Sequence, residues 1–237
     1  MVAALEREVW PFVKNWPVTS KQHEGRSFRF FEQDHVVVVC GGIGPEAARR
    51  AAEAVIYLYR PALLISAGFA GGLDSSLSVG HAIKPRHVID AGDGSQADLG
   101  FGEGVLVSFA TVADASQKMR LATAYGAQAV DMEAAAVARA ADARGVEFLA
   151  LKVISDTSGA GLPPLARFIG SDGRFHGQKF LAHVALRPWL WGSVVRLARD
   201  SAIAARALCG TLQVHTRAAP AEEKGELQTP AEQAQRD

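Results

Sequence analysis

The 237-residue chain is 49% hydrophobic and has a formal net charge of zero, so it can bury one substantial core and offers no bulk electrostatic attraction for nucleic acid. Its two cysteines, Cys40 and Cys209, are too few for a disulfide framework, and their spacing matches no metal motif. No secretory leader opens the chain and no apolar run reaches membrane-spanning length, so the expected compartment is the cytoplasm.

The N-terminal region begins with alternating short apolar and polar runs. Residues 1–9 are typical of the end of a short strand that leads into a helix, with Glu8 in the first helical turn. On spacing alone, Glu8 is a solvated carboxylate that complements the helix dipole. Residues 28–31 and 36–40 predict two strands separated by a polar turn.

Two glycine-rich turns follow. Gly42 and Gly44 lie in a turn that opens a helix over 47–59, where backbone N–H groups can approach an anion. Residues 63–73 predict a buried strand that enters the second glycine turn. Many strand-to-helix turns carry glycine only for its backbone freedom, and the spacing is not that of a dinucleotide fingerprint.

The most informative stretch is a helix followed by a buried strand. Apolar residues at helical spacing predict a helix over 130–144, ended by a basic residue and a glycine. Residues 146–154 are almost continuously apolar, which suits a strand buried on both faces of an α/β sheet. Ser155 and Asp156 end this strand, where open α/β sheets bind their ligands.

The sequence VDMEAAAVA, followed by a strand that ends in ISD, closely resembles the nucleoside phosphorylase and nucleosidase superfamily. That superfamily includes purine nucleoside phosphorylases and methylthioadenosine/S-adenosylhomocysteine nucleosidases. The resemblance covers residues 1–160 and implies a three-layer αβα fold with a central mixed sheet, in a homo-oligomer that cleaves N-glycosidic bonds. We expect one catalytic domain over 1–213, including a helical C-terminal extension over 180–212.

The resemblance also assigns roles to individual residues. Met132 and Glu133 would bind the ribose, and Asp156 would protonate the departing purine, which requires a protonated carboxyl that burial favours. The pattern around Glu8 matches the nucleosidase glutamate that activates the attacking water. Further positions belong to the purine pocket (Val112, Ala113, Ser155) and to the phosphate or water pocket (Gly42, Gly44, Gly68, Phe69). No metal or redox cofactor is implied.

The chain departs from the family pattern in two places before Asp156. Ser66 stands where some phosphorylases have an arginine that contacts phosphate, and losing a charge-assisted contact weighs against phosphate as co-substrate. Arg7, Arg49 and Arg50 are the candidates to replace it. Between residues 80 and 105 we expect only a strand and a loop, whereas the nucleosidases have a longer segment that walls the 5′ side of the ribose. That side should therefore be open.

The C-terminal third departs further. Residues 157–164 predict a lid loop over the site. Residues 180–212 predict a helical region kinked at a proline, and 214–237 have the composition of a disordered tail. Trp189, Trp191 and several arginines are typical either of a helix that packs on the sheet or of peripheral contact with the inner membrane surface through 187–206.

Together, these departures resemble the hopanoid-associated phosphorylases, which are proposed to release adenine from adenosylhopane. The resemblance implies an adenine nucleoside as substrate, carrying a lipid at its 5′ end. Two alternatives stay open in the same chemical class, a methylthioadenosine/S-adenosylhomocysteine nucleosidase and a general purine nucleoside phosphorylase. A third alternative is a non-catalytic nucleoside-binding protein.

Overall fold

The computed structural model describes residues 1–160, 165–170 and 172–218. Its strands are β1 (Val2–Ala3), β2 (Val18–His23), β3 (Arg26–Gln33), β4 (Val36–Cys40), β5 (Leu63–Gly72), β6 (Ala82–Ile83), β7 (His87–Asp90), β8 (Gln96–Asp98), β9 (Val105–Ser108), β10 (Ala129–Asp131) and β11 (Glu147–Asp156). Its helices are α1 (Glu6–Val13), α2 (Pro45–Tyr59), α3 (Ala115–Tyr125), α4 (Ala134–Asp142), α5 (Gly177–Ala185) and α6 (Trp191–Ala218), with 3₁₀ turns η1 (Leu165–Phe168) and η2 (Pro188–Leu190).

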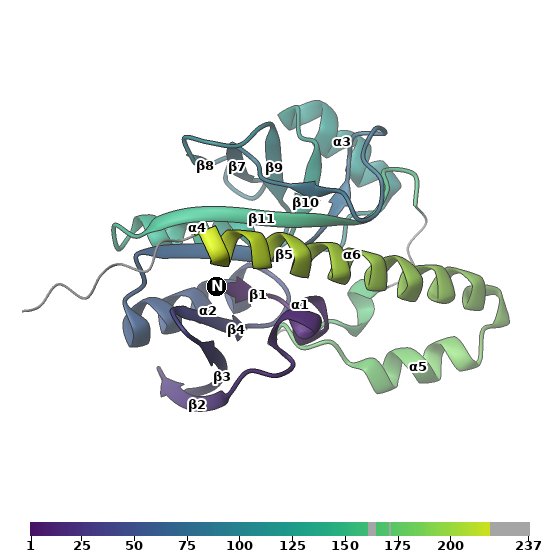
Figure 1. Ribbon diagram of the computed structural model, residues 1–237. Coiled ribbons are helices and arrows are strands. Elements are labelled where there is room, and N and C mark those ends of the chain that lie inside the picture. The colour runs from purple at the N-terminus through teal and green to yellow at the C-terminus, as the bar shows by residue number, and fades with distance from the viewer. Residues whose placement is uncertain (161–164, 171, 219–237) are drawn as a thin grey trace, which may run out of the picture.

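The strands form one mixed sheet that runs through the middle of the molecule (Figure 1). Its order is β2-β3-β4-β1-β5-β10-β9-β7-β8, and β11 pairs with β5 and β6. The central pairs β1–β4, β1–β5 and β11–β5 are parallel, whereas β10 runs antiparallel to β5. The predicted mixed sheet is confirmed.

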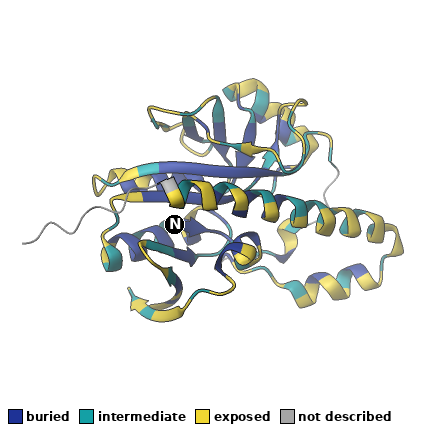
Figure 2. Ribbon diagram, viewed as in Figure 1, coloured by how far each residue is buried: buried dark blue, intermediate teal, exposed yellow. Residues whose placement is uncertain are grey.

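Helices cover both faces of this sheet, and the strands between them are buried (Figure 2). On one face α2 and α4 pack together through small side chains, among them Ala48, Ala51, Ala136 and Ala140, which allow close approach of the two helices. On the other face α1 and α6 share a core with β5 and β11. The predicted three-layer αβα fold is therefore confirmed.

The predicted helix over 130–144 is wrong at its N-terminal end. Val130 belongs to β10, where it pairs with Val107 of β9 and Gly71 of β5. The helix begins only at Ala134. Val130 fits the helical spacing of apolar residues, but its pairing with two neighbouring strands places it in β10 instead.

The middle of the chain holds more regular structure than predicted. Residues 80–105 contain β6, β7 and β8 rather than one strand and a loop. Helix α3 was not predicted, although its start carries a capping box in which the Asp114 side chain accepts from the Gln117 N–H at 2.8 Å and the Gln117 side chain accepts from the Asp114 N–H at 2.8 Å. Near the N-terminus, strand β2 was also not predicted from the sequence.

The C-terminal region is a helical hairpin and not one kinked helix. Helix α5 ends at Ala185, and Pro188, which has no N–H to donate, opens η2 before α6 begins. Helix α6 continues to Ala218, so the first residues assigned to the disordered tail, 214–218, are helical. Part of the predicted lid (161–164) and the rest of the predicted tail (219–237) lie outside the described residues.

Candidate active site

A cavity of about 150 Å³ lies where β5, β10 and β11 end, beside the first turn of α1. Eight of the residues assigned from the sequence line it: Glu8, Phe69, Val112, Ala113, Met132, Glu133, Ser155 and Asp156. They come from five separate parts of the chain, and the fold brings them together. The cavity is thus the candidate active site.

A β-bulge at the end of β11 places the predicted acid. The register of β11 against β5 shifts between Ile154 and Asp156, so that Asp156 pairs with Gly71 and Ser155 is the extra residue. Bulges re-aim side chains at strand ends. Both Ser155 and Asp156 consequently line the cavity, and the Ser155 hydroxyl donates to Asp156 Oδ1 at 2.8 Å.

Two helix N-termini meet at the predicted ribose-binding acid. Glu133 is the N-cap of α4, and its Oε1 accepts the N–H of Gly44, the N-cap of α2, at 2.8 Å. Burial raises the pKa of Glu133 to about 7, and Asp131 adds to the rise, whereas Lys152 and the Gly44 N–H favour the ionised form. Glu133 can therefore carry a negative charge at neutral pH.

A buried lysine offsets the acids of this site, and the sequence analysis assigned it no role. Lys152 Nζ lies 2.8 Å from Asp131 Oδ2, and both side chains are almost fully buried. Burial opposes the charge of Lys152, but Asp131, Glu133 and Glu8 outweigh that effect and raise its pKa. Asp131 also accepts the Ala134 N–H at 2.8 Å and the Ser108 hydroxyl at 2.5 Å, so it is a structural acid at the start of α4.

Glu8 is buried, which excludes the solvated interpretation that its spacing favours. Burial raises the pKa of Glu8 to about 7, while the positive charges of Lys152 and Arg7 oppose the rise. A side chain on Gly68 would come within 3.0 Å of Glu8 Oε2, so Gly68 leaves the room that this carboxylate occupies. A carboxylate with a pKa near neutral is suited to accept a proton from water.

Lys118 of α3 is the ion-pair partner of the predicted acid. Its ammonium donates to Asp156 Oδ2 and, at 2.8 Å, to the carbonyl oxygen of Thr157. Both Lys118 and Asp156 are buried at the cavity wall. Burial is therefore not the only feature of the site that acts on Asp156, because the ammonium of Lys118 also binds its carboxyl group.

Of the four residues assigned to the phosphate or water pocket, Phe69 lines the cavity, whereas the three glycines are not among the lining residues. Gly68 lies beneath Glu8, and the N–H of Gly44 is bound to Glu133. Gly42 packs against Gly173, whose carbonyl oxygen accepts the Ile43 N–H at 2.8 Å. Among the described residues, Ile43 is the member of the glycine turn before α2 that lines the cavity.

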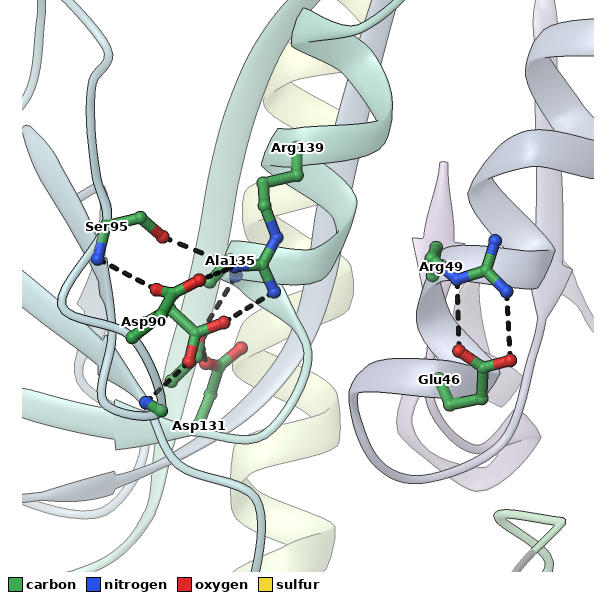
Figure 3. Close-up of polar contacts among 10 residues, drawn as sticks. Glu46, Arg49, Asp90, Ser95, Asp131, Ala135 and Arg139 are labelled. Atoms are coloured by element: carbon green, nitrogen blue, oxygen red, sulfur yellow. Dashed lines mark hydrogen bonds and ion pairs between the residues drawn. The ribbon is translucent and has the colours of Figure 1, made fainter.

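Two of the three arginines proposed to replace the missing phosphate contact are engaged elsewhere. Arg49 forms a bidentate pair with Glu46 on the first turn of α2 (Figure 3), and Arg50 also pairs with Glu46. Arg7 lines the cavity, but its guanidinium carbon lies 5.7 Å from the centre of the Phe175 ring, and its side chain is exposed. Ser66 is buried within β5.

The C-terminal third supplies an apolar wall of the cavity, which was not predicted from the sequence. The apolar residues that form it are Leu165, Ile169, Phe175 and Leu197, and Ser201 also lines the cavity. Leu165 and Phe175 also pack against the cluster that Phe168 of η1 forms with Phe180 of α5. The hairpin and the cavity wall thus share side chains.

A larger hollow of about 640 Å³ lies on the α4 side of the molecule and holds none of the assigned residues. Arg139 lines it and pairs with Asp90 at 2.5 Å (Figure 3), a contact that fixes α4 against the end of β7. Within the described part of the chain, no group of three or more His, Cys, Asp or Glu side chains could hold a metal ion.

A comparison with protein families matches residues 1–117 and 103–169 to the family described as "Phosphorylase superfamily". The chain belongs to the phosphorylase superfamily. Its members are N-glycosidases and phosphorylases, so this protein is an enzyme of that class. A comparison of the sequence with curated proteins finds no significant match.

Solved structures of other superfamily members have the same fold. The 5′-methylthioadenosine nucleosidase of Arabidopsis thaliana superposes with a TM-score of 0.68 at 19% identity, over 91% of this chain and 93% of that one. The futalosine hydrolase of Helicobacter pylori gives 0.63 at 18% identity, over 90% and 96%. The 5′-methylthioadenosine/S-adenosylhomocysteine nucleosidase of Campylobacter jejuni gives 0.62 at 15% identity, over 90% and 97%.

Proposed function

We propose that this phosphorylase-superfamily protein hydrolyses the N-glycosidic bond of an adenine nucleoside and releases adenine. The observation that carries the proposal is Glu8, a buried carboxyl at the cavity wall whose pKa is raised to about 7. Glu133 and Asp156 line the same cavity. Together they provide the base, the cation-stabilising charge and the acid that the reaction needs.

The reaction divides among these groups as follows. The bond between C1′ and the purine nitrogen breaks, its electron pair goes to the purine, and the base accepts a proton from Asp156. Lys118 holds Asp156 in place and can return the proton through its hydrogen bond to Oδ2. Glu133 stabilises the ribosyl cation. Glu8 takes a proton from water as the water oxygen bonds to C1′. Glu8 then gives this proton to solvent, and the pair of Asp156 and Lys118 regains one from solvent, so the sum is addition of one water.

Water is favoured over phosphate as the attacking group. Glu8, Glu133 and Asp131 line the cavity, so a phosphate there would meet three carboxyl groups. Two cations, Arg7 and Lys118, also line it, but Lys118 is paired with Asp156. Arg49 and Arg50 are paired with Glu46 instead, and Ser66 offers no charge. The N–H of Gly44, which could have held an anion, already binds Glu133.

Glu133→Gln is expected to lower kcat by about 10- to 100-fold while KM changes little, because the lost charge acts mainly in the transition state. The amide oxygen can still accept the Gly44 N–H, so the fold should persist. Steady-state kinetics on an adenine nucleoside check this, with the exposed Glu147→Gln as a matched control. A raised KM at unchanged kcat would make Glu133 a uniform binding contact.

Lys118→Met is expected to lower kcat for adenine release by about tenfold or more, since Asp156 loses the ammonium that holds it. Lys118→Arg should restore part of the activity. The deciding measurement compares this substrate with p-nitrophenyl ribofuranoside, whose leaving group needs no proton. An equal loss on both substrates would mean that Lys118 only maintains the fold.

The finer proposal is that the nucleoside is adenosylhopane, in hopanoid biosynthesis. It is supported by the resemblance of the C-terminal third and by the apolar cavity wall formed by Leu165, Ile169, Phe175 and Leu197. We also propose, from the family resemblance, that the protein is a homo-oligomer.

A panel of adenine nucleosides with different 5′ groups tests the substrate. Purified protein is incubated with adenosine, methylthioadenosine, S-adenosylhomocysteine and an adenosine with a long apolar 5′ substituent, and free adenine is measured by chromatography. We expect the highest kcat/KM with the apolar substituent. Rapid turnover of methylthioadenosine alone would indicate the nucleosidase alternative, and binding of every member without adenine release would indicate a non-catalytic protein.

A further inference from the structure

The hairpin formed by α5, η2 and the start of α6 concentrates positive charge. Residues 177–199 include four Lys or Arg and no Asp or Glu, although the whole chain has 25 of each kind. The four basic residues are Lys179, Arg187, Arg196 and Arg199. The neutral protein is therefore polarised, with a basic hairpin and an acidic remainder.

The same hairpin exposes apolar side chains. Five of the twelve exposed large hydrophobic side chains in the described residues lie in it: Leu181, Leu186, Trp189, Trp191 and Val195. Leu186 is 79% exposed and Trp189 is 73% exposed. Exposure of two tryptophans rules out the interpretation that both belong to the core. Single exposed apolar residues are ordinary, but five within fifteen positions form a surface.

Packing and a hydrogen bond hold the hairpin in shape. Phe180 and Val184 of α5 form a small core with Phe168 of η1. The Trp191 indole N–H donates to the Val184 carbonyl oxygen at 3.1 Å, which joins α6 to the end of α5. In Figure 1 the α5 end of the hairpin projects away from the sheet, at the side of the molecule opposite the turn between α4 and β11.

We propose that this hairpin docks on an anionic lipid bilayer. Tryptophan and leucine beside arginine match the interface of such a bilayer, where rings lie at headgroup level and guanidinium groups meet lipid phosphates. The surface lies closer to the N-terminus than the 187–206 contact expected from the sequence, because Leu181 and Leu186 are exposed whereas Ala204 and Ala205 are buried in the fold. No helix in the described part of the chain is long and apolar enough to cross a membrane.

Docking would also place the cavity beside the bilayer, because Leu165 and Phe175 belong both to the cavity wall and to the packing around the hairpin core. A substrate with an apolar 5′ group could then be reached without leaving the lipid. The docking itself does not depend on which reaction the protein catalyses.

Co-sedimentation of the full chain with vesicles tests the proposal. The vesicles are phosphatidylcholine alone, or equal parts of phosphatidylcholine and phosphatidylglycerol, each at low and high salt. We expect binding to the anionic vesicles that weakens with salt. Arg196→Glu/Arg199→Glu should weaken it by at least about tenfold, since each basic residue contributes about fivefold to partitioning. Leu186→Ser/Trp189→Ser should weaken it similarly, while Trp191 is kept because it fastens the hairpin.

Matched control variants change exposed apolar and basic side chains outside the hairpin. Tyr57→Ser/Met119→Ser removes two exposed apolar side chains, and Arg26→Glu/Arg144→Glu changes the net charge equally. We expect both controls to bind like the wild type, with circular dichroism unchanged in all variants. Absence of wild-type binding, or equal losses in variants and controls, would overturn the proposal. So would hairpin variants that alter only the oligomeric state in gel filtration, because the surface would then be a subunit contact.

Discussion

Asp156→Asn is expected to lower kcat for adenine release by about 10²- to 10⁴-fold, the range that a general acid contributes. The amide keeps the shape of the carboxyl group, and its oxygen can accept from Lys118 while its NH2 group donates to the Ser155 hydroxyl oxygen, but it cannot supply the proton of a carboxylic acid. Steady-state kinetics on the best adenine nucleoside measure the loss. The exposed Asp142→Asn, which makes the same chemical change on α4, should have no effect.

A second substrate, whose leaving group needs no proton, distinguishes the loss of the general acid from a general loss of structure. With p-nitrophenyl ribofuranoside, whose leaving group departs without a proton, Asp156→Asn should lose less than about tenfold. Glu133→Gln should lose activity on both substrates, since both pass through a ribosyl cation. Near wild-type adenine release by Asp156→Asn would show that Asp156 is not the acid.

Glu8→Gln is expected to lower kcat by about 10²- to 10³-fold and to leave KM for the nucleoside nearly unchanged, because the glutamine cannot take the proton of the attacking water. In the wild type, kcat should rise with pH through about 7, where Glu8 ionises. The Glu6→Gln variant is the matched control, since Glu6 lies two residues away on α1 and bonds to the surface residue Arg29. Retained turnover in Glu8→Gln would show that Glu8 is not the base that activates the attacking water.

The raised pKa of Glu8 also predicts an effect on stability. A carboxyl group whose pKa rises from 4.5 to about 7 on folding stabilises the fold below about pH 4.5, and this contribution is lost as the pH rises through about 7. Glutamine stays uncharged throughout. Glu8→Gln should therefore be more stable than the wild type at pH 8 by about 3 kcal/mol, and equal to it at pH 4, in thermal or urea unfolding.

Much of the site could be predicted because its residues lie in short stretches with a recognisable order. VDMEA and the strand that ends in ISD gave Met132, Glu133, Ser155 and Asp156, all of which line one cavity. The layers of the fold followed from the apolar runs, since β5 and β11 are buried on both faces. A family pattern carries over most reliably at strand ends, where the backbone itself places the side chains.

The two lysines could not be assigned because their partners lie far away in sequence. Lys118 meets Asp156 across 38 positions, on a helix whose capping box at Asp114 was the missed signal. Lys152 interrupts an otherwise apolar strand, and a charge buried in that way needs a partner. That anomaly could have marked Lys152, but only the fold shows that Asp131 pairs with it.

The proposed preference for water over phosphate also rests on side-chain partners that the sequence does not show. Arg7, Arg49 and Arg50 were equal candidates on spacing, and their side-chain partners separate them. The apolar wall was hidden for a similar reason, since Ile169 and Phe175 stand among glycines and polar residues and come together only through a bridge between these two positions.

Hydrolysis of the adenine nucleoside in ¹⁸O-labelled water, with and without phosphate, tests the central proposal most directly. Mass spectrometry of the sugar product shows which oxygen reached C1′. We expect free adenine and a sugar that carries ¹⁸O, formed at the same rate whether or not phosphate is present. A phosphate-dependent reaction that yields a sugar 1-phosphate without ¹⁸O at C1′ would contradict the assignment of Glu8 as the base that activates water.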